Sequence, residues 1–331
     1  AFSSRDRMQE ASEAPSLMLV NHDDPRHKEL RNIAQKAFTP KRVESDVSPW
    51  LKKTVDHMLA QEGDGYVDFM ANLAPDLPAR FMTKLLGTPE QDHKLLRRWA
   101  NAFMVTADFT IEERNQCNKE LFEYYTNAVA ERYKTIEKGG ALGDDLMTAF
   151  ILAESEGNKL TKEEVVLFCI TLVVAGAETT GYLLCNLVAT FVERPDLFDA
   201  LKQDRKLVRP YIEESLRRDG PIQRLHRECV IDTEVGGQMI KAGEWVAVFF
   251  ASANRDPAVI LKRPNVGRHM TFSHGIHHCM GAGIARNEAE KMLNGILDRY
   301  SAVEAGNGPM VRQRGGLLNY GHDKCPVKFV P

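Results

Sequence analysis

Apolar residues recur every three to four positions through the first two thirds of the chain, a spacing that predicts amphipathic helices. The first helix is expected to follow the Asp-Asp-Pro segment at residues 23–25, which supplies an N-cap and a first-turn proline, and to run to residue 39. The longest helix is expected to begin after Thr161 and to reach about residue 193, because Thr161 and Glu164 have the spacing of a capping box. Other helices are expected at residues 41–61, 66–86, 89–109, 111–138, 146–157 and 284–300.

The pattern changes after Pro221. Residues 229–250 carry alternating and β-branched side chains interrupted by Gly236, Gly237 and Gly243, which predicts a small antiparallel sheet. Residues 315–331 predict a second hairpin. No internal repeat and no linker-like change in composition divides the chain. We therefore expect one mainly α domain over residues 1–331 with small antiparallel β-sheets.

Composition narrows the class of protein. The chain has 331 residues, of which 43% are hydrophobic and 27% charged, and its net charge of -3 provides no global positive field for nucleic acid. The most apolar stretch, residues 165–176, is too short to span a bilayer, and residues 1–15 show no secretory signal. The six cysteines lack the spacing of a disulfide framework. We expect a cytoplasmic protein that binds neither nucleic acid nor membranes.

The densest group of reactive side chains lies at residues 272–281, Phe-Ser-His-Gly-Ile-His-His-Cys-Met-Gly. Cys279 directly precedes a predicted helix, whose unpaired N–H groups favour a thiolate, which is a strong metal ligand. Gly275 and Gly281 would let the loop wrap around a flat cofactor. Two alternatives remain open: Cys279 is a small buried apolar residue in a chance loop, or it binds zinc together with nearby histidines. Those histidines are His269, His274, His277 and His278.

Two further features are ambiguous when each is taken alone. Glu178 and Thr179 are polar residues midway along an apolar helix, where burial costs about 1–3 kcal/mol unless they are hydrogen-bonded. Thr179 could instead donate to the preceding turn and only bend the helix. Glu214 and Arg217 are three apart on one predicted helix, which fits either a structural ion pair or an ordinary exposed salt bridge.

The order and separation of these elements closely resemble the cytochrome P450 family of haem-thiolate monooxygenases. The resemblance covers almost the whole chain. Residues 23–31 are similar to the family's haem-contacting C helix, the ANRDP segment at 253–257 resembles the bacterial subgroup, and GAGIAR at 281–286 is similar to the start of the L helix. The Phe-x-x-Gly-x-x-x-Cys-x-Gly motif at residues 272–281 is highly specific for this family.

The resemblance implies a role for each candidate residue. Cys279 would ligate the iron of haem b (iron protoporphyrin IX), and thiolate donation favours O–O cleavage. Glu178 and Thr179 would deliver protons during dioxygen activation, and Glu214 and Arg217 would be structural. Haem propionates need charge-assisted donors, and the donors would be His27, Arg31, Arg227 and His277. The remaining haem contacts would come from Ala175, Phe272, Gly275 and Gly281. An ordinary solvated position stays open for His27 and for Arg227.

The implied reaction is oxidation of a small to medium, largely apolar molecule, with electrons from a ferredoxin-type donor and its reductase. The substrate pocket would contain Val174, Ile222, Gln223, Leu317 and Leu318, together with Phe103 and Met104. Candidate charges for docking the electron donor are Arg97, Arg98, Arg268, Arg286 and Lys291. The alternatives are a non-catalytic haem-binding sensor and a peroxide-driven enzyme, which would both have less need of Glu178 and Thr179.

The sequence departs from the family pattern in two places. The family normally has several dozen residues before its C helix, whereas this segment begins near residue 23 here. The family also has a meander with an aromatic-Arg segment, and here Ile260 is followed directly by Leu261. We therefore expect the P450 fold without its N-terminal part and part of the meander; either the chain is truncated, or the sequence joins segments that are separated in the whole protein. The third member of the family's Glu-Arg-Arg network has no clear match, although Arg263 lies nearby.

Overall fold

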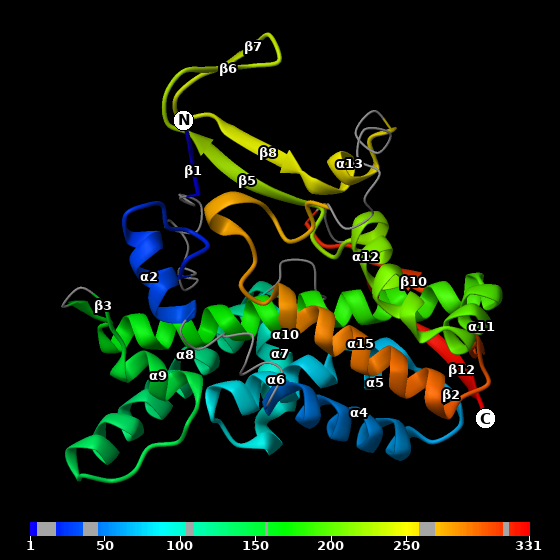
Figure 1. The fold of residues 1–331 in the computed structure, drawn as a ribbon. Helices are drawn as coiled ribbons and strands as arrows, with labels where there is room; N and C mark the ends of the chain where they lie inside the picture. Colours follow the sequence, from blue (N-terminus) through cyan, green and yellow to red (C-terminus); the bar gives the residue numbers. More distant parts are fainter. Residues whose placement is uncertain (5–17, 36–45, 104–108, 156–157, 258–268, 314–317) are drawn as a thin grey trace.

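The computed structural model describes residues 1–4, 18–35, 46–103, 109–155, 158–257, 269–313 and 318–331. These residues form a mainly α fold with small antiparallel sheets, as the sequence predicts (Figure 1). The helices are α2 (Arg26–Gln35), α4 (Ser48–Glu62), α5 (Phe69–Asn72), α6 (Asp76–Leu86), α7 (His93–Phe103), α8 (Ile111–Glu137), α9 (Leu146–Leu152), α10 (Lys162–Glu193), α11 (Pro195–Gln203), α12 (Val208–Asp219), α13 (Phe250–Arg255) and α15 (Ala282–Arg299). Three short 3₁₀ helices are η2 (Glu90–Asp92), η3 (Arg205–Leu207) and η4 (Gly275–His277).

Helix α10 is the centre of the fold, and α6, α7, α8, α12 and α15 pack around it (Figure 1). The predicted capping box is confirmed: the Glu164 N–H donates to Thr161 Oγ1 at 3.1 Å, and the Thr161 N–H donates to Glu164 Oε2 at 2.8 Å. By length and hydropathy alone α10 could cross a membrane, but 72% of its most apolar window is buried inside the protein. A helix that is apolar on all sides and covered by other helices is a core helix.

Helix α2 is attached to the N-terminal end of α10. The Arg26 guanidinium pairs with Glu29 of its own helix at 2.8 Å and also with Glu164, the capping residue of α10. Leu30 and Ile33 of α2 are buried in the common core. This attachment sets the position of the α2 side chains that face the cysteine loop, which we define as residues 269–281.

A three-stranded antiparallel sheet lies against the cysteine loop on the side away from the main helices (Figure 1). Strand β5 (Arg224–Cys229) pairs with β1 (Phe2–Ser3) and with β8 (Trp245–Phe249). Between β5 and β8 in the chain, β6 (Thr233–Val235) and β7 (Gln238–Ile240) form a hairpin. The hairpin turn is Gly236-Gly237, and both residues have positive φ, of 57° and 82°. This sheet confirms the prediction for residues 229–250.

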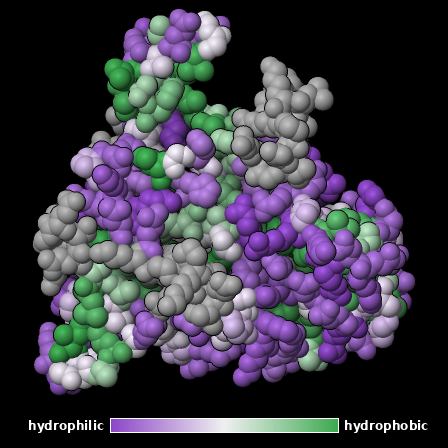
Figure 2. All heavy atoms as spheres, in the orientation of Figure 1, coloured by the Kyte–Doolittle hydropathy of each residue, from purple (hydrophilic) through white to green (hydrophobic). Residues whose placement is uncertain are grey.

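Exposed apolar side chains are concentrated on this sheet and hairpin, where Figure 2 shows hydrophobic residues at the top of the molecule. They include Phe2, Val235, Met239, Trp245 and Phe249. The helical part buries most of its large apolar side chains in one core, although some, such as Ile111 and Leu152, are exposed.

The prediction of one helix over residues 66–86 is wrong. Residues Gly65–Asp68 form strand β2, Asp68 then caps the short helix α5 by accepting from the Met70 and Ala71 N–H groups, and α6 begins only at Asp76. The strand exists because it pairs with β12 (Pro326–Val330), a partner at the other end of the chain. A local pattern of apolar residues contains no signal for such a distant partner.

The predicted hairpin over residues 315–331 is also wrong. Strand β11 (His322–Lys324) pairs with β10 (Val311–Arg312), whereas β12 lies between β2 and β9 (Ala302–Ala305). The C-terminal segment therefore belongs to two separate sheets. A further two-stranded sheet joins β3 (Glu154–Ser155) and β4 (Asn158–Lys159).

Candidate active site

The cysteine loop is closed by a hydrogen bond from the Cys279 N–H to the Phe272 carbonyl at 2.9 Å. Ser273 and Gly275 both have positive φ, of 62° and 71°, so the tight loop depends on the left-handed region at these positions. Gly281 has an ordinary φ of -78° as the N-cap residue of α15. A Cβ at Gly281 would lie 3.8 Å from Cys279 Sγ, so the absence of a side chain keeps the space beside the sulfur free.

Cys279 is the one exposed residue among the six cysteines, all of which are described and free. Enough protein nevertheless surrounds the thiol that burial raises its pKa, against the N–H groups of Gly281 and Ala282 and the charges of Arg31 and Arg286. The N–H groups at the helix N-terminus act to lower the pKa of this thiol, the direction that the sequence predicts, and the larger effect of desolvation raises it. A metal ion reverses this balance, since a coordinating thiol is deprotonated outright.

Arg31 holds the backbone of the cysteine loop. Its Nη1 donates to the Ile276 carbonyl at 2.9 Å and its Nη2 donates to the His278 carbonyl at 2.8 Å. The guanidinium thus fixes the two residues on either side of His277, and its charge acts on the Cys279 thiol. The sequence places Arg31 near this site, but it does not indicate the contacts to the carbonyl oxygens.

Two histidines meet beside the cysteine loop. The His27 and His277 rings have centroids 4.5 Å apart, and His277 Nε2 lies 2.7 Å from Ser4 Oγ. His27 is only 2% exposed, which excludes a solvated position for it. Burial lowers the pKa of His277 to about 4, and the nearby charge of Arg227 acts in the same direction. Burial and the charge of Arg31 also lower the pKa of His27, so both rings are neutral near pH 7.

Arg227 completes this group from strand β5. It is half-buried, burial lowers its pKa, and the carboxylate of Asp23 acts in the opposite direction. Asp23 in turn accepts from the Ser4 N–H at 3.0 Å and from the Ser3 hydroxyl. The structure thus brings His27, Arg31, Arg227 and His277 to one place, as the sequence predicts, and adds Asp23 as a neighbour.

The middle of α10 presents a small exposed position within an otherwise buried helix. Ala175 is exposed, whereas Val174 beside it is 3% exposed and belongs to the core. The Thr179 hydroxyl donates to the Ala175 carbonyl at 2.7 Å. This bond is the one expected of a helix-bending threonine, and it leaves the lone pairs of the hydroxyl oxygen available to accept.

Glu178 is 3% exposed, and its Oε2 has no hydrogen-bond partner among the described residues. Burial raises its pKa to about 7, while the charge of Arg97 and a hydrogen bond from Tyr182 act to lower it. A carboxyl group with a pKa near neutrality can hold or release a proton under physiological conditions.

Arg97, one of the candidate docking charges, is half-buried and hydrogen-bonded within the protein. Its Nη1 donates to the Ala71 carbonyl at 2.8 Å and its Nη2 to the Met70 carbonyl at 3.2 Å, at the end of α5. Arg286 is likewise engaged, in a pair with Glu213. Arg98 is exposed and Lys291 is half-buried, and Arg268 lies outside the described residues.

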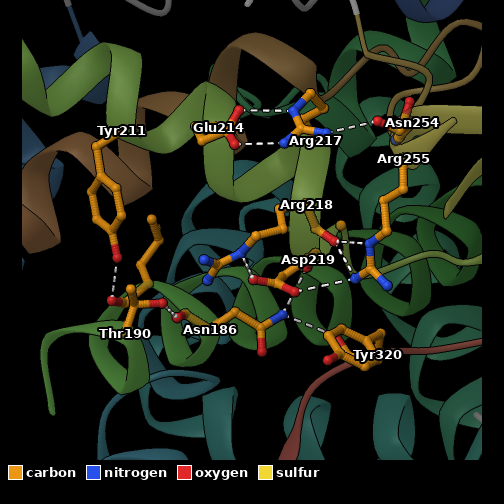
Figure 3. A network of polar contacts seen from close by, with 12 residues as sticks. Asn186, Thr190, Tyr211, Glu214, Arg217, Arg218, Asp219, Asn254, Arg255 and Tyr320 are labelled. Atoms are coloured by element: carbon orange, nitrogen blue, oxygen red, sulfur yellow. Dashed lines mark hydrogen bonds and ion pairs between the residues drawn. The ribbon is translucent and has the colours of Figure 1, made fainter. Parts of the chain in front are cut away.

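Glu214 and Arg217 form the predicted pair, with Arg217 Nη2 2.6 Å from Glu214 Oε1 and Nε 2.8 Å from Oε2 (Figure 3). Arg217 Nη1 also donates to the Asn254 carbonyl at 2.8 Å. The Asn254 side chain continues to the cysteine loop, accepting from the Met270 N–H at 2.7 Å and donating to Thr271 Oγ1 at 3.0 Å. Sequence analysis missed Asn254 as the link, although it is part of the ANRDP segment. Arg263 lies outside the described residues.

His269 does not share a metal site with the other histidines of the loop. Its Nε2 lies 3.2 Å from Glu213 Oε2 on α12. Among the residues that the structure describes, no group of three or more His, Cys, Asp or Glu side chains converges as a metal site. Sequence analysis also missed Glu213, whose only signal was its place next to Glu214.

Three residues predicted to line the substrate pocket lie together. The Gln223 N–H donates to the Leu318 carbonyl at 2.8 Å, and Ile222 forms a β-bridge with Asn319. Leu317 and Met104 lie outside the described residues. Two hollows, of ≈ 580 Å³ beside β8 and ≈ 490 Å³ beside α9, are lined by none of the candidate residues.

These residues fit a haem. One exposed cysteine stands before α15, two guanidiniums and two neutral imidazoles surround the loop, and α10, which packs on α15, exposes a single small residue at Ala175. Anionic propionates match the guanidiniums, and a flat ring matches an exposed alanine whose own side chain is small. The buried Glu178 Oε2, which has no partner among the described residues, is a further polar atom available to a bound group.

Comparison with known proteins agrees with this assignment. The sequence model named Cytochrome P450 matches residues 90–319. The chain is 33% identical to the cytochrome P450 monooxygenase PikC of Streptomyces venezuelae, over 91% of this chain and 74% of that protein. It is 31% identical to the biotin biosynthesis cytochrome P450 of Bacillus subtilis, over 90% of this chain and 76% of that protein. The crystal structure of CYP109E1 from Bacillus megaterium in complex with corticosterone matches with a TM-score of 0.84 and 30% identity, over 99% of this chain and 87% of that one.

Proposed function

The chain belongs to the cytochrome P450 family and is an oxidoreductase of that family, and we propose that it binds haem b through Cys279 and oxidises a small to medium, largely apolar molecule. The observation that carries this proposal is the exposed thiol of Cys279, held in front of α15 by its own N–H bond to the Phe272 carbonyl. When bound, the haem supplies the activation of dioxygen, and the thiolate ligand favours O–O cleavage.

The residues around the loop would hold the cofactor. Arg31 and Arg227 supply positive charge for the propionates, and the neutral rings of His27 and His277 supply N–H donors. Charge-assisted hydrogen bonds of this kind are about twice as strong as neutral ones. Ala175 on α10 leaves room for the flat face of the ring.

The residues of α10 would manage protons. Glu178 holds a proton on its carboxyl group near neutral pH, because burial raises its pKa to about 7. Thr179 keeps its hydroxyl oxygen available as an acceptor while its proton points to the Ala175 carbonyl. A proton would pass from Glu178 through an intervening water to this hydroxyl, the transfer that a general acid performs.

The substrate is proposed from the apolar character of the expected lining. Ile222, Gln223 and Leu318 lie together and supply one polar side chain among apolar ones. The Bacillus megaterium relative was solved with corticosterone, a compound of this class. Electrons would come from a ferredoxin-type donor and its reductase in the cytoplasm, with the exposed Arg98 as one docking charge.

The test begins with the carbon monoxide difference spectrum of the reduced, haem-loaded protein, which is expected to be of the thiolate type. A screen of apolar compounds for a substrate-induced change of spin state then identifies ligands. Turnover of these ligands is compared with two oxidant systems, dioxygen with a reconstituted electron-transfer chain and hydrogen peroxide alone. A monooxygenase oxidises them with the first, a peroxide-driven enzyme with the second alone, and a sensor with neither.

A further inference from the structure

Two ion pairs join α12 to α15, one turn apart on each helix. Arg286 Nε and Nη2 donate to the two carboxylate oxygens of Glu213 at 2.6 and 2.9 Å, and Arg209 Nε donates to Glu290 Oε2 at 3.1 Å. Their settings differ: the side chain of Arg286 is 31% exposed, whereas that of Arg209 is 79% exposed. The inner pair is therefore less screened by solvent than the outer pair.

The inner pair is connected to the cysteine loop. The Arg286 guanidinium lies 4.5 Å from the centroid of the Phe272 ring, and the Phe272 carbonyl accepts the Cys279 N–H. The charge of Arg286 also acts on the Cys279 thiol. The guanidinium thus lies against the ring of the residue whose carbonyl closes the turn that carries Cys279.

Glu213 is held in place by a third donor. The Thr271 N–H donates to His269 Nδ1 at 3.3 Å, so the ring proton is on Nε2, which lies 3.2 Å from Glu213 Oε2. Burial acts to raise the pKa of Glu213, but the hydrogen bonds from His269 and Arg286 outweigh it and lower the pKa to about 2. The carboxylate is therefore charged over the whole range in which the protein is handled.

The other guanidinium near the sulfur has a different partner. Arg31 donates to the carbonyl oxygens of Ile276 and His278, which are neutral groups. Of these two guanidiniums, that of Arg286 is therefore the one with a carboxylate partner among the residues that the structure describes. This asymmetry gives Glu213 an electrostatic role in addition to joining two helices.

We propose that Glu213 is a positioning residue that sets the reduction potential of the haem by partly neutralising Arg286 beside Cys279. The inference rests on the proposed ligation of haem by Cys279. The step concerned is uptake of one electron by the ferric haem from an external reductant, with no bond made or broken. A positive charge near the sulfur stabilises the state with the additional electron, and a negative charge destabilises it. Loss of the carboxylate and loss of the guanidinium should therefore shift the potential in opposite directions.

The test is a spectroelectrochemical titration of the haem-loaded protein and its variants. Glu213→Gln should favour the reduced state by a factor of several to about tenfold, and a tenfold change in a one-electron equilibrium is about 59 mV. Arg286→Met should shift the equilibrium the other way, and the double variant should fall between the two. Glu290→Gln, which removes the carboxylate of the outer pair, should leave the potential unchanged.

Opposite shifts cannot come from a general loosening of the loop, which would move both single variants alike. Shifts of the same sign, or a Glu290→Gln shift as large as that of Glu213→Gln, would overturn the proposal. If Glu213→Gln does not bind haem, two other variants test the proposal. Glu213→Asp keeps the negative charge and should retain the wild-type potential. Arg286→Met removes the positive charge and should lower the potential. Failure of the proposed function is recognised separately, because the wild-type carbon monoxide spectrum would then lack the thiolate form.

Discussion

Arg31 Nη2 donates to the carbonyl oxygen of His278 at 2.8 Å, so α2 holds the backbone directly before Cys279. The second donor of the same guanidinium binds the Ile276 carbonyl at 2.9 Å. A residue expected to bind a cofactor group therefore also shapes the loop that presents the sulfur. Cofactor binding and loop stability are coupled through this one side chain.

Arg31→Met should weaken cofactor binding and also destabilise the cysteine loop. Hydrogen bonds from a charged donor contribute about 1.5–3 kcal/mol, and because these two are solvent-accessible we expect the free energy of unfolding to fall by about 1–2 kcal/mol. The fraction of protein that retains haem after gel filtration should fall as well. Lys28→Met, which removes an exposed cation from the same helix, is the control and should change neither quantity. Equal haem retention in the two variants would contradict a role for Arg31 in the loop.

Cys279→Ser should abolish the thiolate-type spectrum of the reduced carbon monoxide complex, because a hydroxyl cannot donate as a thiolate does. Cys229→Ser is the matched control, since the buried Cys229 thiol bonds to the Ile231 carbonyl at 3.1 Å and lies in strand β5 rather than the loop. The measurement is the reduced difference spectrum of each variant. A thiolate spectrum that persisted in Cys279→Ser would assign the ligand to another cysteine.

Arg217→Ala should destabilise the folded protein. It leaves the Glu214 carboxylate and the Asn254 carbonyl without their donor, and Asn254 carries the first residues of the cysteine loop. We expect the free energy of unfolding to fall by about 2–3 kcal/mol in urea titrations, since charged hydrogen bonds are lost from a partly buried site. Asp196→Asn breaks the fully exposed pair with Arg194 and should change the free energy of unfolding much less, because solvent screens that pair. Similar losses in both variants would show that the Arg217 network contributes no more than a surface pair.

The sequence reveals the parts of this site that depend on near neighbours along the chain. The capping box of α10, the positive φ at Gly275 and the three-residue spacing of Glu214 and Arg217 are all local features, and the structure contains each of them. Strand β2 could not be foreseen in this way, because residues 65–68 become a strand only through β12. The link through Asn254 and the pair of Glu213 with Arg286 likewise require α12, α13 and α15 to be assembled first.

Burial also determines the ionisation and the environment of side chains, which a local sequence pattern does not reveal. The helix N-terminus before Ala282 predicts a thiolate at Cys279, yet desolvation outweighs it and raises the thiol pKa. His27 could be a solvated residue on the basis of its helix, yet it is buried against His277. In both cases the outcome depends on protein atoms contributed by other elements, which sequence spacing does not specify.

Glu288 should make stability depend on pH. This α15 side chain is 1% exposed, and burial raises its pKa from the ordinary 4.5 to about 8, against a hydrogen bond from Thr180 of α10. Between these values the folded protein keeps a proton that the unfolded chain loses, so stability falls as the pH rises from about 4.5 through 8. The slope due to one group is at most about 1.4 kcal/mol per pH unit.

Glu288→Gln should remove that slope, so that the variant gains stability relative to the wild type as the pH rises. The measurement is urea denaturation at intervals from pH 5 to 8. Glu131→Gln is the control: the Glu131 carboxylate pairs with Lys134 at the surface, which lowers its pKa out of this window. Parallel curves for the wild type and Glu288→Gln would show that the carboxyl group is ionised in the folded state.

Thr179→Ala tests whether the α10 hydroxyl manages protons or only bends the helix. Haem binding and ligand binding should change little, because Thr179 is half-buried and its hydroxyl donates to the Ala175 carbonyl of its own helix. The proton held near neutral pH by Glu178 would then lack its acceptor, and reducing equivalents should be diverted to hydrogen peroxide.

Thr190→Ala is the matched control for Thr179→Ala. Thr190 lies in the same helix, and its Oγ1 donates to the Asn186 carbonyl at 2.9 Å. The quantity to measure is product formed per reduced nicotinamide consumed, with the electron-transfer chain and a ligand from the spin-state screen. We expect this ratio to fall several-fold in Thr179→Ala and to stay at the wild-type value in Thr190→Ala. An unchanged ratio in both variants would leave Thr179 with a helix-bending role and would favour a peroxide-driven reaction.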